Sequence, residues 1–378
     1  MSILKTAMFS ILVLLACAVS ISAQNLTTVP IQFRGVAPVI EIKINGQGPF
    51  IFAIDTGGGM QADVDISLAE KLKLPKNGKV RGGDPSGRNV REFETVNIDL
   101  ITLGDVEFHN TTAVMRERLL TPNYPKVDGV LGFALFTDYL LTLDYPGKQV
   151  RLARGELPAA NGADILTFES PRRIPVVDLN IGTMKVRAHV DAGNMVGSFM
   201  IPAELVEKLT LSSPPITVGQ ARTVNNEVEI KEARLNDTIK LGKFSYEQPT
   251  ITFPAIANEA NIGFKVLREF ALTFDQKNKR MKLERSAPAK VAPLAISEAE
   301  GQDYQGSYGE RTITFEGGAL YIQRPQGQKL KLVRVSRDEF TLQAVPQAQI
   351  KFVRDEKGKP KEIHVLNQAG KWEVSTRQ

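Results

Sequence analysis

The sequence predicts an all-β protein made of two pseudo-symmetric lobes, followed by a small antiparallel β domain at the C terminus. Two observations support this prediction. Residues 28–156 and 170–286 contain matching blocks in the same order, which indicates an internal duplication. Short runs also alternate with a period of two, for example Ile40, Ile42 and Ile44 on one side of a strand, as is typical of β-structure.

The composition fits a folded, globular chain. Of the 378 residues, 42% are hydrophobic and 24% are charged, which excludes a disordered chain, a collagen and a polytopic membrane protein. The net charge of +5 is small and spread along the sequence, so we expect no nucleic-acid partner. Cys17 is the single cysteine, which excludes a disulfide framework and a cysteine-type zinc site.

The first 23 residues have the layout of a secretory signal peptide. Lys5 precedes an apolar core, Ala7 to Ala18, and the small residues Ser20 to Ala23 offer a cleavage site. Two alternatives stay open: an uncleaved N-terminal anchor, and a lipoprotein in which Cys17, after Leu-Leu-Ala, carries the lipid. All three predict export to the periplasm or the medium, with membrane attachment only if the signal is uncleaved or Cys17 is lipidated.

The duplication consists of three pairs of blocks. The first block of each copy reads strand, turn, strand, Asp-x-Gly and short helix; the second and third are strand-rich, and the third contains an apolar-apolar-Gly or Asn-Ile-Gly element. The matching segments are Pro38–Leu74 with Pro175–Leu211, Ile101–Phe108 with Ile239–Tyr246, and Val130–Asp144 with Asn261–Asp275. We therefore expect one lobe over residues 28–156 and a second over residues 170–286.

Each copy contains an aspartate-glycine turn directly after an apolar strand: Asp55-Thr56-Gly57 and Asp191-Ala192-Gly193. A single such aspartate is usually a turn former that accepts backbone N–H bonds. Two of them at equivalent places can meet on the pseudo-twofold axis. Carboxylates about 3 Å apart share one proton, and such a pair can act as general acid and general base on a water molecule without a metal or another cofactor.

These motifs resemble the aspartic proteases of the pepsin and retropepsin type, most closely the two-lobed bacterial members with short retropepsin-like lobes, over residues 30–286. The resemblance implies a pepsin-like bilobal body in which Asp55 and Asp191 are the catalytic pair. It also implies an extended peptide or protein substrate in a cleft beneath a hairpin flap. The residues that would support the catalytic turns are Thr56, Gly57, Ala192, Gly193 and Asn194.

The second turn departs from the family pattern. Ala192 replaces the usual threonine or serine and removes one of two hydroxyl braces between the turns, whereas Thr56 retains the other. This loss predicts a less acidic working pH than that of an all-threonine site. Asn194 could hydrogen-bond the outer carboxylate oxygen, and Asn261 stands where an apolar residue is expected.

A Gly/Pro-rich cluster, Val80 to Arg88, precedes a strand-like run and has the position of a flap hairpin by analogy; an ordinary surface hairpin is the alternative. The candidate flap residues are Gly82, Gly83, Asp84 and Gly87. The three histidines lack a metalloprotease spacing, so we expect no metal site.

The C-terminal part is expected to be a separate unit, with a linker over residues 287–300 and a small β domain over residues 301–378. Seven short strand-like runs separated by turns predict a meander or half-barrel. The pattern Tyr304 to Tyr308, Phe340, Phe352 and Trp372 resembles the small β domain appended to some bacterial hydrolases related to β-lactamases. An accessory or binding module and a stabilising appendage are both open.

The sequence thus predicts an exported aspartic endopeptidase that uses Asp55 and Asp191. One alternative is a weak or inactive relative that binds peptides or envelope components, since Ala192 weakens the site. Another is a structural envelope protein whose lobes assemble with partners. The sequence does not predict an oligomeric state.

Overall fold

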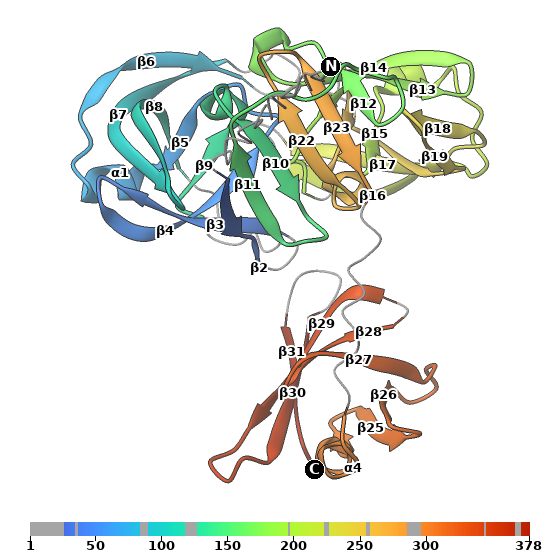
Figure 1. Ribbon diagram of the computed structural model, residues 1–378. Coiled ribbons are helices and arrows are strands. Elements are labelled where there is room, and N and C mark those ends of the chain that lie inside the picture. Colours follow the sequence, from blue (N-terminus) through green and yellow to red (C-terminus); the bar gives the residue numbers. More distant parts are fainter. Residues whose placement is uncertain are drawn as a thin grey trace, which may run out of the picture.

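The structure is a computed structural model of the chain (Figure 1). It describes residues 26–34, 37–83, 90–117, 127–195, 197–222, 227–254, 258–285, 296–343, 345–366 and 372–378. The predicted signal peptide, with Cys17, and most of the predicted linker lie outside the described residues. Within the described ranges, the structure contains no helix with the length and apolar character needed to cross a bilayer.

The first lobe is an eight-stranded sheet in the order β2-β3-β4-β9-β5-β8-β7-β6, and β3 also pairs with β7. Its strands are β2 (Gln32–Arg34), β3 (Ala37–Ile44), β4 (Gln47–Asp55), β5 (Ala62–Asp65), β6 (Lys76–Gly82), β7 (Arg91–Leu103), β8 (Val106–Arg116) and β9 (Gly129–Gly132). The short helix α1 (Ile66–Lys71) follows β5 and is capped by the Asp65 carboxylate, and the 3-10 turn η1 (Phe133–Phe136) follows β9.

The second lobe is a nine-stranded sheet in the order β16-β17-β20-β15-β21-β14-β13-β18-β19. Its strands are β13 (Val176–Ile181), β14 (Met184–Val190), β15 (Phe199–Met200), β16 (Ile216–Arg222), β17 (Glu227–Arg234), β18 (Thr238–Leu241), β19 (Phe244–Glu247), β20 (Thr250–Pro254) and β21 (Ala260–Ile262). The 3-10 turn η2 (Pro171–Arg173) precedes it, and it includes the helices α2 (Ala203–Val206) and α3 (Phe264–Leu267).

The two lobes repeat one topology. The first-lobe order β3-β4-β9-β5-β8-β7-β6 matches the second-lobe order β13-β14-β21-β15-β20-β17-β16 strand for strand. The match includes two parallel pairings in each lobe, β4 with β9 and β5 with β8, repeated as β14 with β21 and β15 with β20. The sequence duplication therefore corresponds to a repeated three-dimensional unit, and the all-β prediction is confirmed.

A six-stranded sheet joins the lobes, in the order β1-β11-β10-β22-β23-β12, and Figure 1 labels all of these strands except β1. Its strands are β1 (Thr27–Pro30), β10 (Leu140–Asp144), β11 (Gln149–Ala153), β12 (Ile165–Thr167), β22 (Ala271–Asp275) and β23 (Arg280–Glu284). At its centre β10 runs antiparallel to β22 with Thr142 opposite Thr273, and their hydroxyls lie 2.9 Å apart. This symmetric pair marks where the pseudo-twofold axis crosses the sheet, and one continuous apolar core extends through both lobes.

The C-terminal domain has its own core and lies apart from the two-lobed body in Figure 1. Its eight strands follow the chain in order, β24-β25-β26-β27-β28-β29-β30-β31. They are β24 (Gly306–Tyr308), β25 (Arg311–Glu316), β26 (Ala319–Gln323), β27 (Leu330–Ser336), β28 (Glu339–Leu342), β29 (Val345–Arg354), β30 (Pro360–Leu366) and β31 (Trp372–Thr376). A bridge between Tyr308 and Arg377 links the first strand to the chain end, so the meander curls toward a closed barrel.

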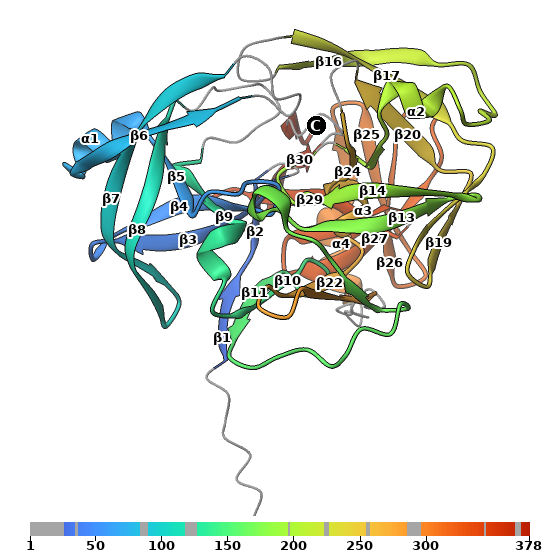
Figure 2. The same cartoon turned by 90° about the horizontal axis from the view of Figure 1, so that it is seen from above.

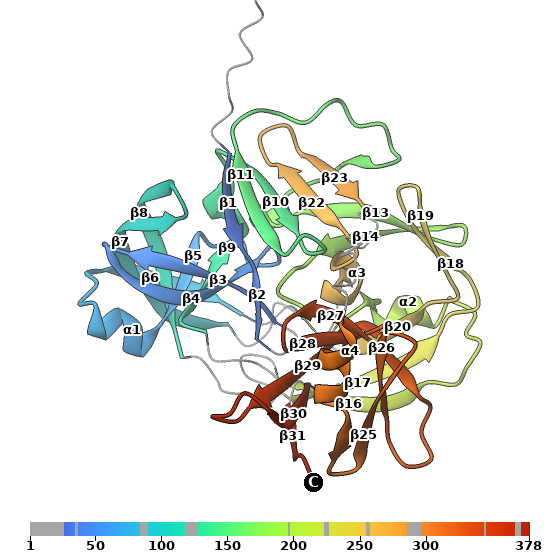
Figure 3. The same ribbon diagram turned by 60° about the horizontal axis from the view of Figure 1, so that its bottom comes forward.

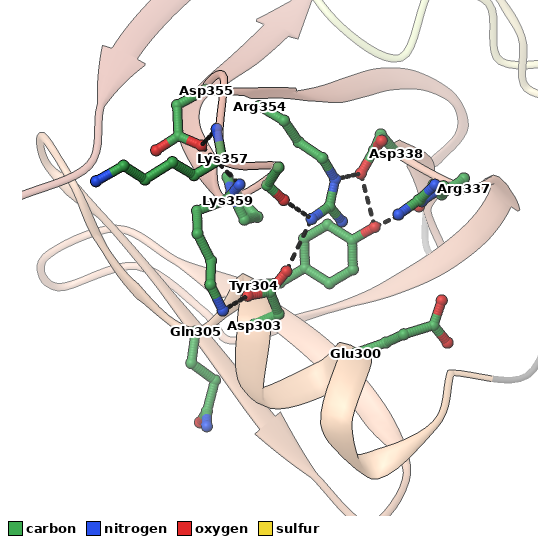
Figure 4. Close-up of polar contacts among 12 residues, drawn as sticks. Glu300, Asp303, Tyr304, Gln305, Arg337, Asp338, Arg354, Asp355, Lys357 and Lys359 are labelled. Carbon is green, nitrogen blue, oxygen red and sulfur yellow. Dashed lines mark hydrogen bonds and ion pairs between the residues drawn. The ribbon is translucent and has the colours of Figure 1, made fainter.

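A helix that the sequence analysis missed begins within the stretch expected to be linker. This helix, α4 (Glu298–Tyr304), starts with a capping box in which Ser297 and Glu300 exchange hydrogen bonds. The helix lies beside β25 in Figure 1, and Figure 3 shows the same domain from another side. Tyr304 inserts its ring among the core aromatics, with Phe352 at a ring distance of 4.8 Å. Its hydroxyl bonds Asp338, which also binds Arg354 at 2.8 Å (Figure 4).

Candidate active site

The Asp55 turn forms because an apolar strand ends on a carboxylate. Phe52 and Ile54 of β4 point into the lobe core, so the alternation of the strand turns Ala53 and Asp55 to the opposite face. The parallel pairing with β9 places Asp55 opposite Gly132. The turn closes with the Gly57 amide, which donates to Asp55 Oδ1 at 2.8 Å.

The Asp191 turn follows the same plan in the second lobe. Val190 of β14 is buried in the core, and Asp191 comes next, at the end of the strand. The backbone amides of Gly193 and Asn194 donate to Asp191 Oδ1 at 2.9 and 3.0 Å. Both aspartates are therefore fixed by the backbone of their own turns.

The fold brings the two turns together face to face. A Cβ built on Gly57 would lie 2.5 Å from Cγ of Asp191, and a Cβ built on Gly193 would lie 2.5 Å from Cγ of Asp55. Each glycine thus packs directly against the carboxyl group of the other lobe, and any side chain at either position would collide with it. Both aspartates remain partly exposed.

A single hydroxyl braces the two turns. Thr56 is fully buried; its hydroxyl donates to the Val190 carbonyl at 2.6 Å and accepts from the Ala192 amide at 2.9 Å. Ala192 is also fully buried and has no hydroxyl to return these bonds. Two buried backbone groups of the second lobe are therefore satisfied by one side chain of the first.

The outer side of Asp191 is held by asparagines. The Asn261 side chain donates to Asp191 Oδ2 at 2.6 Å, and the Asn194 side chain donates to Asn261 Oδ1 at 2.9 Å. Asn194 Oδ1 in turn accepts from the Gly197 amide at 3.0 Å. The side-chain bond that the sequence analysis considered for Asn194 is therefore made by Asn261, which β21 carries beside β14, and Asn194 orients Asn261 instead.

A buried phenol lies within electrostatic reach of both aspartates. Tyr145 follows β10 and its ring packs edge-on against Phe264 at 4.9 Å. Burial raises the pKa of Tyr145 well above its ordinary value, and the charges of Asp55 and Asp191 raise it further. Tyr145 therefore stays neutral.

The candidate flap is described only in part. Gly82 ends β6 and pairs with Arg91 of β7, and Gly83 follows it, whereas Asp84 and Gly87 lie outside the described residues. The second lobe carries a corresponding hairpin, β16 with β17. In Figure 2 both hairpins extend from their lobes toward the middle of the molecule.

The sequence analysis missed the roles of two site residues, Asn261 and Tyr145. Asn261 was noticed only as a departure from the apolar pattern, and the parallel β14–β21 pairing, which the block repeat implies, would have placed it beside Asp191. Tyr145 directly follows the third repeated block and carries no local signal of its position. Across the part of the chain that the structure describes, no three histidine, cysteine, aspartate or glutamate side chains gather closely enough to hold a metal ion.

Comparison with known proteins found a family match for part of the first lobe. Residues 40–135 match a family model described as aspartyl protease, so this part of the first lobe is an aspartyl protease-like domain and supports a protease-like function. The matched segment runs from β3 to η1 and includes the Asp55 turn. No curated protein was found to match the chain.

Proposed function

We propose that the protein is an exported aspartic endopeptidase that cleaves peptide bonds with a water molecule held between Asp55 and Asp191. The observation that carries this proposal is the reciprocal packing of the turns, in which Gly57 and Gly193 each lie against the carboxyl group of the opposite lobe. Export rests on the N-terminal sequence pattern.

The chemistry follows from a pair of carboxyls that share one proton. One carboxylate takes a proton as the water oxygen bonds to the peptide carbonyl carbon, and the protonated carboxyl hydrogen-bonds the carbonyl oxygen. The carbon–nitrogen bond then breaks, and a proton passes to the leaving amine. The Thr56 brace and the Asn261 bond hold the carboxyls in place, so little reorganisation is needed during the reaction.

The second candidate function is peptide binding without cleavage. Ala192 favours it, because the turns are braced by the Thr56 hydroxyl without a counterpart from Ala192. A less rigid pair would hold the water less accurately while leaving the binding surface intact. The same lobes would then bind an extended peptide or an envelope component.

The test compares wild type with Asp55→Asn and Asp191→Asn on a denatured protein substrate between about pH 3 and pH 7, with cut sites mapped by mass spectrometry. We expect either substitution to lower kcat/KM by about a thousandfold or more. Asp178→Asn is the matched control, because Asp178 is an exposed aspartate paired with Lys185 on the same lobe, and it should leave cleavage unchanged. If wild type and variants are equally inert but still bind peptide, the binding function is correct.

A further inference from the structure

A row of side chains crosses the sheet face opposite the lobe core, and it starts at Ala53, two residues before Asp55 on β4. Asp63 of β5 is paired with Val130 of β9 and with Val114 of β8, and Val130 is paired with Ala53 of β4. The residues that alternate with them are core residues. These alternating core residues are Phe52, Ile54, Ala62, Val64, Ala113, Met115 and Leu131. The row therefore shares the face that carries Asp55.

Arg116 lies next to this row, at the C-terminal end of β8. It lies two residues after Val114, so its side chain is on the same face. Its Nε lies 3.8 Å from Asp63 Oδ2, and its guanidinium stacks on the Phe93 ring at 4.6 Å. The Arg116 side chain is 26% exposed and that of Asp63 only 5%, so the arginine is the member of the pair that a ligand can reach.

Arg116 lies beside the described part of the candidate flap. Its Nη2 lies 3.5 Å from where a Cβ of Gly82 would be, and Phe93 pairs with Val80 across the hairpin. Burial lowers the pKa of Arg116, and the charge of Asp55 opposes that change, so the two groups interact electrostatically. A guanidinium remains charged at any working pH of a protease.

The second lobe lacks this charged pair. Met200 has the position of Asp63, because it is opposite Asn261 of β21 and Thr252 of β20 as Asp63 is opposite Val130 of β9 and Val114 of β8. Pro254 has the position of Arg116, since it lies two residues after Thr252 as Arg116 lies two residues after Val114. Ile230, paired with Pro254, takes the place of Phe93. The duplicated rows thus differ in chemistry: one presents a cation on an aromatic ring, and the other presents uncharged side chains at the same three places.

We propose that Arg116 is a specificity-determining residue that selects substrates with an acidic side chain, aspartate or glutamate, on the first-lobe side of the scissile bond. The inference rests on the proposed peptidase function and names its substrate class. A planar guanidinium in an ion pair with Asp63 and stacked on Phe93 has the fork of N–H groups that matches a substrate carboxylate. A substrate lysine at this place would meet like charge.

The experiment uses peptides that differ only in carrying Glu, Gln or Lys at each of the three positions on either side of a mapped cut. For wild type we expect one position, on one side of the cut, to favour Glu over Gln over Lys. Arg116→Gln should lower kcat/KM for the Glu peptide by about tenfold, and change that for the Gln peptide by no more than about twofold. Arg116→Lys should keep part of the preference, since it keeps the charge without the planar fork.

Arg268→Gln is the matched control, because burial also lowers the pKa of Arg268 and its guanidinium also lies over a ring, that of Phe264. It should leave the preference unchanged, and thermal unfolding should show that the Arg116 variants are folded. A wild type without a preference for Glu, or a preference that survives in Arg116→Gln, overturns the inference.

A binding measurement separates this inference from the proposed function. Fluorescence anisotropy of the Glu and Gln peptides is measured on Asp191→Asn with and without Arg116→Gln. If wild type cleaves none of the peptides, but the Glu peptide binds about tenfold tighter than the Gln peptide and loses that advantage with Arg116→Gln, the peptidase proposal fails and the role of Arg116 stands. If cleavage occurs without any acidic preference in cleavage or binding, the role of Arg116 fails alone.

Discussion

The two aspartate turns have the same backbone but different supports. In the first lobe, the turn residue after the aspartate is Thr56, whose hydroxyl reaches across to two backbone groups of the second lobe. In the second lobe, that position is Ala192, and the support comes instead from Asn261, which binds the carboxylate of its own lobe. The equivalent of Asn261 in the first lobe is Val130, which cannot make such a bond.

This difference shows that the two copies of a duplicated unit can supply different hydrogen bonds to support one carboxyl pair. The backbone geometry comes from the repeated strand order, and each lobe needs it. Hydrogen bonds that hold the two turns can come from either lobe, because both turns meet at one point. A hydroxyl on one side and a carboxamide on the other together replace the two symmetric hydroxyls that the family resemblance implies.

The largest expected effect comes from the feature that both turns share. Gly57→Ala places a methyl group against Asp191, and Gly193→Ala places one against Asp55, so each should push the carboxyls apart. A displacement of about 1 Å can cost a hundredfold in rate, and we expect at least that loss in kcat for both variants. Steady-state kinetics with the mapped peptide gives the measurement.

The control for these variants is Gly219→Ala on β16, where a Cβ would meet nothing within 4 Å. It should fold and cleave like wild type. Unequal effects of the two active-site substitutions, with only one of them harmful, would show that the turns are not equivalent in the way their packing indicates.

The next effect tests the support that differs between the turns. Asn261→Val gives the second lobe the residue found at the equivalent first-lobe position, and it removes the bond to Asp191 Oδ2. Hydrogen bonds to charged groups contribute about 1.5–3 kcal/mol, so we expect kcat to fall by about tenfold or more with KM little changed. Kinetics of purified variants separates the two constants.

Asn278→Ala is the control for this substitution. Asn278 Nδ2 makes a similar bond to Asp275 Oδ2, at 2.9 Å, in the sheet that joins the lobes. Loss of that bond should leave kcat unchanged. An Asn261→Val variant with wild-type kcat would mean that the asparagine bond has no part in holding the pair.

Much of the similarity between the lobes could be predicted from the sequence, because each matching block is a short, continuous segment. The matching blocks around Asp55 and Asp191 preserve strand, turn and helix in order, and the strand order of the lobes repeats accordingly. The C-terminal strands were also visible as short apolar runs, for example Ala319 to Gln323, which is strand β26. The helix α4 was missed although Ser297 and Glu300 have the spacing of a capping box.

The supports could not be predicted in the same way, since they depend on contacts between distant strands. Asn261 reaches Asp191 only because β21 runs parallel to β14 in one particular register. Arg116 reaches Asp63 and Phe93 through three neighbouring strands, β5, β8 and β7. A shift of one residue in any of these pairings would turn the side chain to the other face, and a single sequence does not fix the register between segments so far apart.

The smallest effect concerns the missing brace. Ala192→Thr adds a hydroxyl at the second-lobe position equivalent to Thr56, and this hydroxyl should hold the turns closer together. A more firmly held pair needs less reorganisation during the reaction, so we expect kcat to rise by about two- to threefold, measured by steady-state kinetics with the mapped peptide. Ala192→Gly, which adds no hydroxyl, should not raise kcat. A wild-type kcat in Ala192→Thr would show that the Thr56 hydroxyl alone already holds the carboxyls at their working separation.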